Sequence, residues 1–260
     1  MLPFWPDVLE PALARLRPEV VVEIGAESGK CTHRLLELSA GWGGRVHAVD
    51  PAPRFEVAAW EARYGERFVM HQAPSLEVIP RLERFDVVLI DGDHNWYTVF
   101  HELTGIEERA SALDHPMPLM FLHDVAWPYG RRDLYYDPET IPAEHRQPWA
   151  KRGMSPTSSE LVDSGGFNAH LCHAEHEGGP KNGVLTAVED FLAVSKTSFT
   201  FVRIPAVFGL AILVPDHVGE AHPELLAAAK AWAVPEVARF IDRMETARIA
   251  MLTGLAARAR

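Results

Sequence analysis

The sequence predicts an α/β protein built on one doubly wound, mostly parallel β-sheet. Three observations lead to this fold class. Short apolar runs with little alternation recur along the chain as far as Asp124, as expected for strands covered on both faces. Helical stretches separate these runs. Several runs also end in acidic residues or histidine, which is typical of the ligand-binding edge of an open α/β sheet.

Length and composition limit the classes of protein to consider. With 260 residues, 47% hydrophobic and 23% charged, the chain can bury a sizeable core in one domain. Its formal net charge of -11 lacks the basic character of a nucleic-acid binder, so a neutral or weakly charged substrate fits better. Its two cysteines, Cys31 and Cys172, make neither a disulfide framework nor a CxxC zinc pair.

Neither a secretory signal nor a membrane-spanning segment is expected. The chain starts without a basic region ahead of a long apolar core. No apolar run approaches the roughly 20 residues needed to cross a bilayer. We therefore expect no membrane association and a cytoplasmic location.

The expected elements alternate between strand and helix in the first half of the chain. The strands are Val20–Ile24, Val46–Val49, Arg67–Met70, Phe85–Ile90 and Leu119–Leu122. The helices between them are Thr32–Leu38, Phe55–Tyr64, Leu76–Leu82 and Trp96–Ala112. Later, a helix over Gly183–Ser195 precedes two strands, Phe199–Ile204 and Gly209–Val214. The short link between these strands predicts an antiparallel hairpin at one edge of the sheet.

We expect one domain over residues 1–260, with an insertion and a helical tail. Residues 125–182 are rich in Pro, Gly, aromatic residues, Arg and His, and we interpret them as a substrate-binding lid without regular structure. Residues 222–260 are predicted to be helical, with Pro235 dividing two helices. Apolar positions in this tail are expected to pack on the domain or on a second copy, so a homodimer is one prediction.

A glycine motif follows the first predicted strand and opens the first helix. It reads Glu23-x-Gly25-x-x-x-Gly29-x-x-Thr32. A dinucleotide-binding turn requires glycine where Glu27 stands, and its carboxylate would repel a phosphate. A P-loop requires one more residue between the glycines and a hydroxyl where Cys31 stands. The motif therefore disfavours a phosphate ligand.

An acid at a strand end and a wide glycine turn suit a ligand that has an ammonium group and no phosphate, such as S-adenosylmethionine. Glu23 would meet the ammonium, and Gly25 would let the backbone approach. Ser28 or Thr32 would bond the carboxylate, which the helix start also favours electrostatically. Asp50, at the second strand end, is placed to accept both ribose hydroxyls. A plain strand–turn–helix without a ligand is the alternative.

Polar residues after the third strand extend this predicted cofactor site. Gln72 and Ser75 are candidates for reading the adenine. Together, the glycine motif, Asp50 and the closing hairpin resemble the class I S-adenosylmethionine-dependent methyltransferases. The resemblance covers roughly residues 17–124 and 183–214. It implies a Rossmann-like methyltransferase fold, S-adenosylmethionine as cofactor and transfer of its methyl group.

Two further strand ends carry acids and histidines. Asp91, Asp93 and His94 follow the fourth strand, and His123 and Asp124 follow the fifth. Asp91 and Asp124, with Asp93 or His123, offer ligands for a divalent ion, magnesium being the first choice. A cation there would lower the pKa of a substrate hydroxyl, and His94 or Asp93 would take its proton. Alternatively, Asp91 caps the next helix and His94 bonds a backbone carbonyl.

This cluster resembles that of the metal-dependent O-methyltransferases that act on macrolide and aminocoumarin sugars and on polysaccharides. The resemblance implies that Asp91 binds the metal, in addition to its place in the cofactor site, and that Asp93 or His94 is the base. In that branch the fifth strand ends in paired acidic ligands, whereas this chain has His123-Asp124. The departure leaves the identity and the presence of the metal open.

The predicted lid supplies candidate substrate-binding residues. They are Trp127, Tyr129, Arg131, Arg132, Tyr135, Tyr136 and His145. Aromatic faces stack on sugar rings, and arginine donates several hydrogen bonds to hydroxyls. The same residues could instead pack the loop against the core.

The sequence thus favours an S-adenosylmethionine-dependent O-methyltransferase, assisted by magnesium, that acts on a hydroxyl of a sugar, glycoside or polysaccharide. A phenolic or catechol acceptor is an alternative within the same class. An NAD-dependent oxidoreductase and a non-catalytic cofactor-binding module are alternatives outside it. Glu27 argues against the oxidoreductase, and the acid–histidine cluster argues against the binding module.

Overall fold

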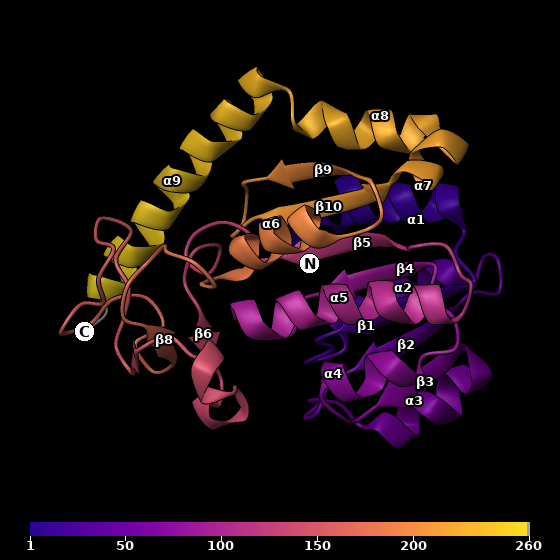
Figure 1. Cartoon of the computed structure of the whole chain (residues 1–260), viewed down its shortest axis with the longest axis horizontal. Helices are drawn as coiled ribbons and strands as arrows, with labels where there is room; N and C mark the ends of the chain where they lie inside the picture. The colour runs from indigo at the N-terminus through magenta and orange to yellow at the C-terminus, as the bar shows by residue number, and fades with distance from the viewer. Residues whose placement is uncertain (259–260) are drawn as a thin grey trace.

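A seven-stranded sheet forms the centre of the molecule in the computed structural model, which describes residues 1–258 (Figure 1). Its strand order is β3-β2-β1-β4-β5-β10-β9. The strands from β3 to β5 are parallel, and β10 and β9 are antiparallel to their neighbours. The strands are β1 (Val20–Ile24), β2 (Arg45–Val49), β3 (Phe68–His71), β4 (Val87–Ile90), β5 (Leu119–His123), β9 (Phe199–Ile204) and β10 (Leu210–Pro215).

The predicted fold class is therefore confirmed. All five predicted parallel strands are present, with small shifts at their ends. The predicted hairpin is also present, because β10 pairs with β9 over its whole length and β9 forms the edge of the sheet. A continuous apolar run predicts a doubly covered strand well, because each face of the sheet has its own layer of helices.

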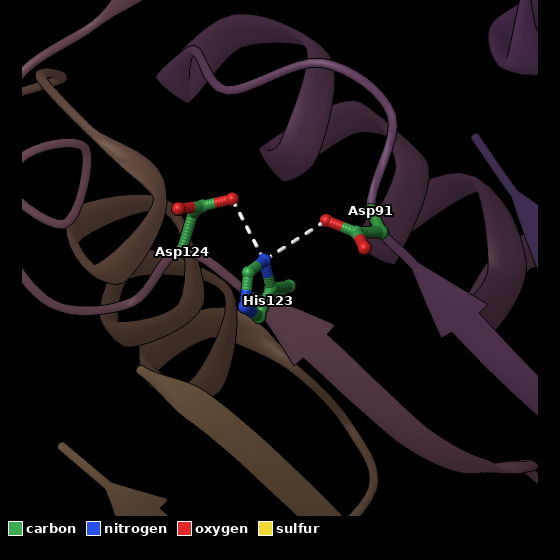
Figure 2. A group of neighbouring side chains, drawn as sticks. All are labelled: Asp91, His123 and Asp124. Carbon is green, nitrogen blue, oxygen red and sulfur yellow. Dashed lines mark hydrogen bonds and ion pairs between the residues drawn. The ribbon is translucent and has the colours of Figure 1, made fainter. Parts of the chain in front are cut away.

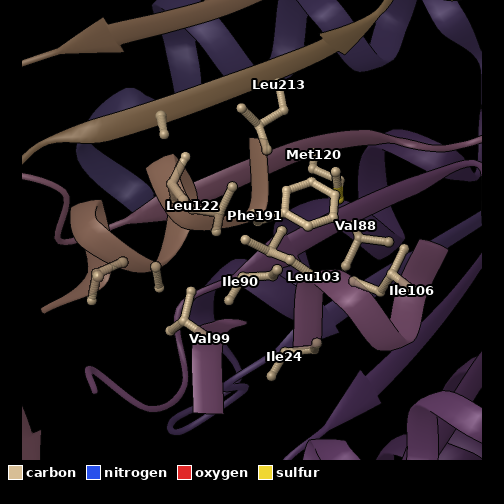
Figure 3. Close-up of a cluster of buried hydrophobic side chains, with 14 of the residues drawn as sticks. Ile24, Val88, Ile90, Val99, Leu103, Ile106, Met120, Leu122, Phe191 and Leu213 are labelled. Carbon is tan, nitrogen blue, oxygen red and sulfur yellow. The ribbon is translucent and has the colours of Figure 1, made fainter. Parts of the chain in front are cut away.

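Helices cover both faces of the sheet. One face packs against α4, α5 and α6, where Val88 and Met120 of the sheet meet Leu103 and Phe191 (Figure 3). The opposite face, with Val87 and other inward side chains, packs against α1, α2 and α8. The helices are α1 (Glu10–Leu16), α2 (Lys30–Ser39), α3 (Val57–Tyr64), α4 (Ser75–Val78), α5 (Trp96–Ala112), α6 (Val184–Val194), α7 (Asp216–Ala221), α8 (Pro223–Trp232) and α9 (Pro235–Arg258).

The insertion differs from the sequence prediction, because it contains regular structure. A separate three-stranded antiparallel sheet, in the order β6-β8-β7, lies within it. Its strands are β6 (Leu134–Tyr135), β7 (Trp149–Ala150) and β8 (Cys172–Ala174). Strands of two or three residues are too short to produce a readable alternation of apolar and polar residues. They are held by pairings between distant parts of the insertion.

The tail folds as two helices, α8 and α9, and Pro235 begins the second, as predicted. Glu245 of α9 accepts a hydrogen bond from the Phe208 amide in the β9–β10 loop (2.9 Å). The Arg248 guanidinium lies 4.6 Å from the centre of the Phe208 ring. The tail is thus anchored to the loop that joins the two antiparallel strands. Within residues 1–258, no helix combines the length and the apolar character that crossing a bilayer requires.

Candidate active site

A cavity of about 870 Å³ lies at the carboxyl ends of the parallel strands. Gly25 follows β1, Asp50 follows β2, Asp91 follows β4 and Asp124 follows β5, and all four line this cavity. Ligands of open α/β sheets bind at this edge because the loops after the strands diverge there. Most of the predicted site residues that follow strands therefore line the same cavity in the described part of the chain.

The glycine turn brings two strand ends close together. Gly25 has a φ of 89°, a left-handed value that favours glycine. A Cβ atom at this position would collide with the backbone of Asp91 and Gly92. The turn therefore fixes how closely the loop after β1 approaches the loop after β4. That approach brings the predicted cofactor site next to the acid–histidine cluster.

Glu23, in contrast, lies in the core beneath the turn. Its side chain accepts a hydrogen bond from the Thr32 hydroxyl, and only 2% of its surface is exposed. Burial, with a smaller contribution from the charge of Asp91, raises the pKa of Glu23 to about 7, although the Thr32 hydrogen bond opposes this. Glu23, Ser28 and Thr32 are not among the residues that line the cavity. Their direct contact with a ligand remains a prediction.

Asp50 is held at the cavity wall by two backbone amides. Its Oδ2 accepts a hydrogen bond from the Glu27 amide (2.7 Å), and its Oδ1 accepts one from the Ala52 amide (2.8 Å). These bonds fix the carboxylate and leave lone pairs on both oxygens. Ser75 also lines the cavity, whereas Gln72 is exposed and lies outside the lining.

The acid–histidine cluster brings together Asp91, His123 and Asp124 (Figure 2). Nδ1 of His123 lies 3.0 Å from Oδ1 of Asp91 and 2.9 Å from Oδ2 of Asp124. One ligand atom from each of the three residues lies within 4.8 Å of the other two. The other oxygen of Asp91 accepts a hydrogen bond from the Met1 ammonium (2.8 Å).

The hydrogen bonds of His123 indicate that a proton or a cation lies between its Nδ1 and the two carboxylates. Its Nε2 lies 3.0 Å from the Val207 carbonyl oxygen, so Nε2 must carry a hydrogen and donate. In a neutral ring Nδ1 would then present a lone pair to two carboxylates. Either a second proton or a cation between Nδ1 and the carboxylates removes this conflict. The donor set of one imidazole nitrogen and two carboxylates therefore fits a divalent metal ion.

The carboxylates of the site favour the protonated forms of His123 and His94. Burial opposes charging of His123, but the carboxylates of Asp124 and Asp91 outweigh it and raise its pKa to about 10. Burial likewise opposes charging of His94, and Asp124 again outweighs it, so the pKa of His94 is also raised. The two histidines in turn hold the pKa of Asp124 well below its usual range, against the effect of burial.

The two candidate bases both line the cavity. Nε2 of His94 lies 2.7 Å from Oδ2 of Asp124, and its Nδ1 lies 3.4 Å from the Tyr136 hydroxyl. Asp93 accepts a hydrogen bond from the Thr98 hydroxyl (3.0 Å) at the start of α5. The structure therefore brings the predicted metal ligands and the predicted bases into one site.

The predicted substrate residues divide into two groups. Tyr129, Tyr135 and Tyr136 line the cavity. The other four lie outside the lining and have structural contacts instead. Trp127 packs against Phe167, and His145 packs against Tyr97. Arg131 forms an ion pair with Glu189 of α6, and Arg132 donates hydrogen bonds to the Ala174 and Ser159 carbonyls. Binding of a substrate by these four residues stays a prediction.

Sequence reasoning missed several residues of the site. Phe167, Asn168 and Phe208 line the cavity, and nothing in their local pattern indicates this. Glu102 is fully buried and also lines it. Its position gave a usable signal, because it lies on the apolar stripe of α5 defined by Val99, Leu103 and Ile106, where an acid is out of place.

The sheet and the cavity at its strand ends have the arrangement of an open α/β protein that binds a ligand at the carboxyl edge of its strands. Residues 22–125 match the family profile described as a methyltransferase domain, Methyltransf_24. This segment contains the strands from β2 to β5, most of β1 and the loops that carry the acid–histidine cluster. This part of the chain is therefore similar to a methyltransferase domain, and the match covers less than half of the 260 residues.

Solved methyltransferase structures are similar to this chain at low sequence identity. The 1,6-didemethyltoxoflavin-N1-methyltransferase of Burkholderia thailandensis, solved with 1,6-didemethyltoxoflavin and S-adenosylhomocysteine, is 22% identical; the match covers 81% of this chain and 79% of that chain, with a TM-score of 0.43. The O-methyltransferase TomG of Streptomyces achromogenes, solved with S-adenosylmethionine, is 17% identical over 80% and 78%, with a TM-score of 0.42. The O-methyltransferase of Bacillus cereus, solved with S-adenosylhomocysteine, is 16% identical over 79% and 78%, with a TM-score of 0.45. No curated protein matches the chain.

Proposed function

We propose that the protein is an S-adenosylmethionine-dependent O-methyltransferase. The observation that carries this proposal is the single cavity that joins Gly25 and Asp50 to Asp91 and Asp124. The first pair suits an adenosyl ligand, and the second pair lies where an acceptor hydroxyl would meet the methyl group. Methyl transfer is an in-line displacement, so the main contribution of the protein is alignment of oxygen, carbon and sulfur. The methyltransferase-domain match supports this reaction class.

We further propose that Asp91, His123 and Asp124 hold a divalent cation, with magnesium as the first choice. When bound, such an ion lowers the pKa of the acceptor hydroxyl. Asp93 is then the favoured base, because Nε2 of His94 is already engaged by the carboxylate of Asp124. In this scheme His94 orients Asp124, to which it is hydrogen-bonded.

The proposed acceptor is a hydroxyl of a sugar, glycoside or polysaccharide. The acceptor end of the cavity is lined by the rings of Tyr129, Tyr136, Phe167 and Phe208, which suit stacking on a sugar face. A phenol or catechol is the second candidate. It is favoured by the same aromatic walls, which suit stacking on a phenolic ring.

Calorimetry with S-adenosylhomocysteine tests the cofactor half of the proposal. We expect saturable binding by the wild type, and a loss of about tenfold in affinity for Asp50→Ala, since ribose hydrogen bonds to a carboxylate are removed. Asp163→Ala, at a fully solvated position of the insertion, is the matched control and should bind as the wild type does. A wild-type protein that does not bind this ligand contradicts the proposal.

Assays of methyl transfer to a panel of glycosides and catechols test the proposed metal and the proposed acceptor. EDTA should suppress turnover, and added magnesium should restore it. Asp91→Asn should abolish turnover while S-adenosylhomocysteine still binds. Full activity after treatment with EDTA would remove the metal from the proposal, and the acceptor class that is turned over decides between the two candidates.

A further inference from the structure

A second polar feature, which belongs to neither the proposed metal ligands nor the proposed bases, lines the same cavity. Glu102 is on α5, and Ser75 begins α4. The Ser75 hydroxyl donates to Oε1 of Glu102 at 2.5 Å. Oε2 of Glu102 is buried and has no hydrogen-bond partner among the described residues. The methyl-transfer scheme above gives this carboxyl no role.

A buried carboxyl oxygen without a partner is costly, so such atoms in native proteins usually meet water or a ligand. Glu102 has no exposed surface and is part of the cavity wall, so we take a molecule seated against this wall as the partner of Oε2. Burial, with a smaller contribution from the charge of Asp93, raises the pKa of Glu102 to about 8. At neutral pH the carboxyl is therefore a donor as well as an acceptor.

The position of the pair in the cavity indicates which part of the ligand it meets. In the proposed function, Asp91 and Asp124 mark the reacting end of the cavity, and Asp50 binds the ribose. In an adenosyl sulfonium the ribose lies between the sulfur and the base. With sulfur toward Asp91 after β4, the base lies beyond Asp50, toward β3, the neighbour of β2 in the sheet. Ser75 follows β3, and Glu102 is hydrogen-bonded to it.

Resting on the proposed cofactor, we propose that Glu102 is the residue that selects adenine. Because Ser75 donates to Oε1, the carboxyl proton resides on Oε2 and is donated to N1 of the base. Adenine has a lone pair at N1, whereas hypoxanthine has a hydrogen there. A hydrogen-bond donor at Oε2 therefore pairs with N1 of adenine. It clashes with the hydrogen at N1 of hypoxanthine, so a ligand with that base binds less tightly. Ser75 is a positioning residue that fixes the carboxyl.

Calorimetry with S-adenosylhomocysteine and S-inosylhomocysteine tests this assignment. The wild type should bind the adenosyl compound about tenfold more tightly, the effect of exchanging one buried donor–acceptor pair for a donor–donor clash. Glu102→Gln should keep this preference, because its amide nitrogen donates from the same place. Glu102→Leu should lose it, and Glu108→Gln, at an exposed site on α5, should behave as the wild type does.

The base preference separates recognition from a merely structural role. A structural defect in Glu102→Leu would weaken both ligands equally and leave their ratio unchanged, which would overturn the assignment, as would loss of the preference in a folded Glu102→Gln. Thermal melts and circular dichroism establish that each variant is folded. If the wild type binds neither compound, the proposed function itself fails. If it binds both equally, the cofactor stands and the role of Glu102 does not.

Discussion

Glu23 illustrates how strongly burial controls single residues beside this cavity. The sequence places an acid at the end of a strand, and such a side chain can point to the ligand edge or into the layer beneath it. In the structure it points into the layer, where the hydroxyl of Thr32 donates to it. A carboxyl in this position is neutral over much of the usual pH range, because its pKa is about 7.

We expect Glu23→Gln to make stability less dependent on pH. The folded-state pKa is raised from 4.5 to about 7, so the contribution of Glu23 is fully present below pH 4.5 and is lost as the pH rises through 7. Relative to the variant, the wild type should lose up to about 3 kcal/mol of unfolding free energy between pH 4.5 and 8. Urea unfolding at several pH values measures this. Glu108→Gln is the exposed control, and parallel curves for Glu23→Gln and the wild type would contradict the prediction.

Residues at strand ends were the predictable part of the site. Asp50, Asp91 and Asp124 each follow an apolar run that forms a strand. Because parallel strands all end at the same edge of the sheet, the three residues line one cavity there. Glu102 and the insertion residues could not be placed in the same way. The apolar stripe of α5 marks Glu102 as a buried acid, but its proximity to the cavity depends on how α5 packs on the sheet. The insertion residues depend on how a long connection folds back, which no local pattern encodes.

Among the elements, the insertion depends on one buried acid that the sequence analysis did not single out. Asp133 accepts hydrogen bonds from the amides of Trp96 (2.7 Å) and Gly183 (2.6 Å) and from the Tyr135 hydroxyl (2.7 Å). These groups begin α5, precede α6 and lie in β6. Because the three come from distant segments, Asp133 joins the insertion to the domain at the point where the chain leaves β5 and re-enters at α6.

Replacing Asp133 with Ala should therefore loosen the insertion. Three buried donors would lose their acceptor, and we expect a loss of about 2–4 kcal/mol in unfolding free energy. Limited proteolysis should show faster cleavage within residues 125–182. Asp163→Ala changes an acid of the same insertion whose side chain is 98% exposed, and it should leave both measurements unchanged. Equal protease resistance of Asp133→Ala and the wild type would exclude this role.

At the scale of the whole molecule, the layered sheet was predictable because each apolar run and each helical stretch reports on burial over many residues. The tail was predictable in its helices but not in its contacts. One face of α9 is anchored through Glu245, while Phe240, Met244 and Met251 are exposed on another face. Their spacing places them along one stripe of the helix.

The predicted homodimer through the C-terminal helices can be tested on this stripe. If the tail joins two copies, the wild type should sediment as a dimer. The double variant Phe240→Glu with Met244→Glu should then sediment as a monomer, since charges would replace the apolar contact. Asp242→Asn, an exposed neighbour, is the control. A wild type that is monomeric at all concentrations removes this prediction.

Phe208 connects the two ends of the fold. Its ring lies in the wall of the cavity and 5.8 Å from the ring of Phe167, while its amide and its ring are both in contact with α9. The width of the cavity at this wall is therefore set in part by a helix that lies far downstream of the parallel strands in the sequence. A change in the tail, whether by truncation or by contact with another molecule, would therefore alter the shape of a cavity to which the described residues of the tail contribute no wall.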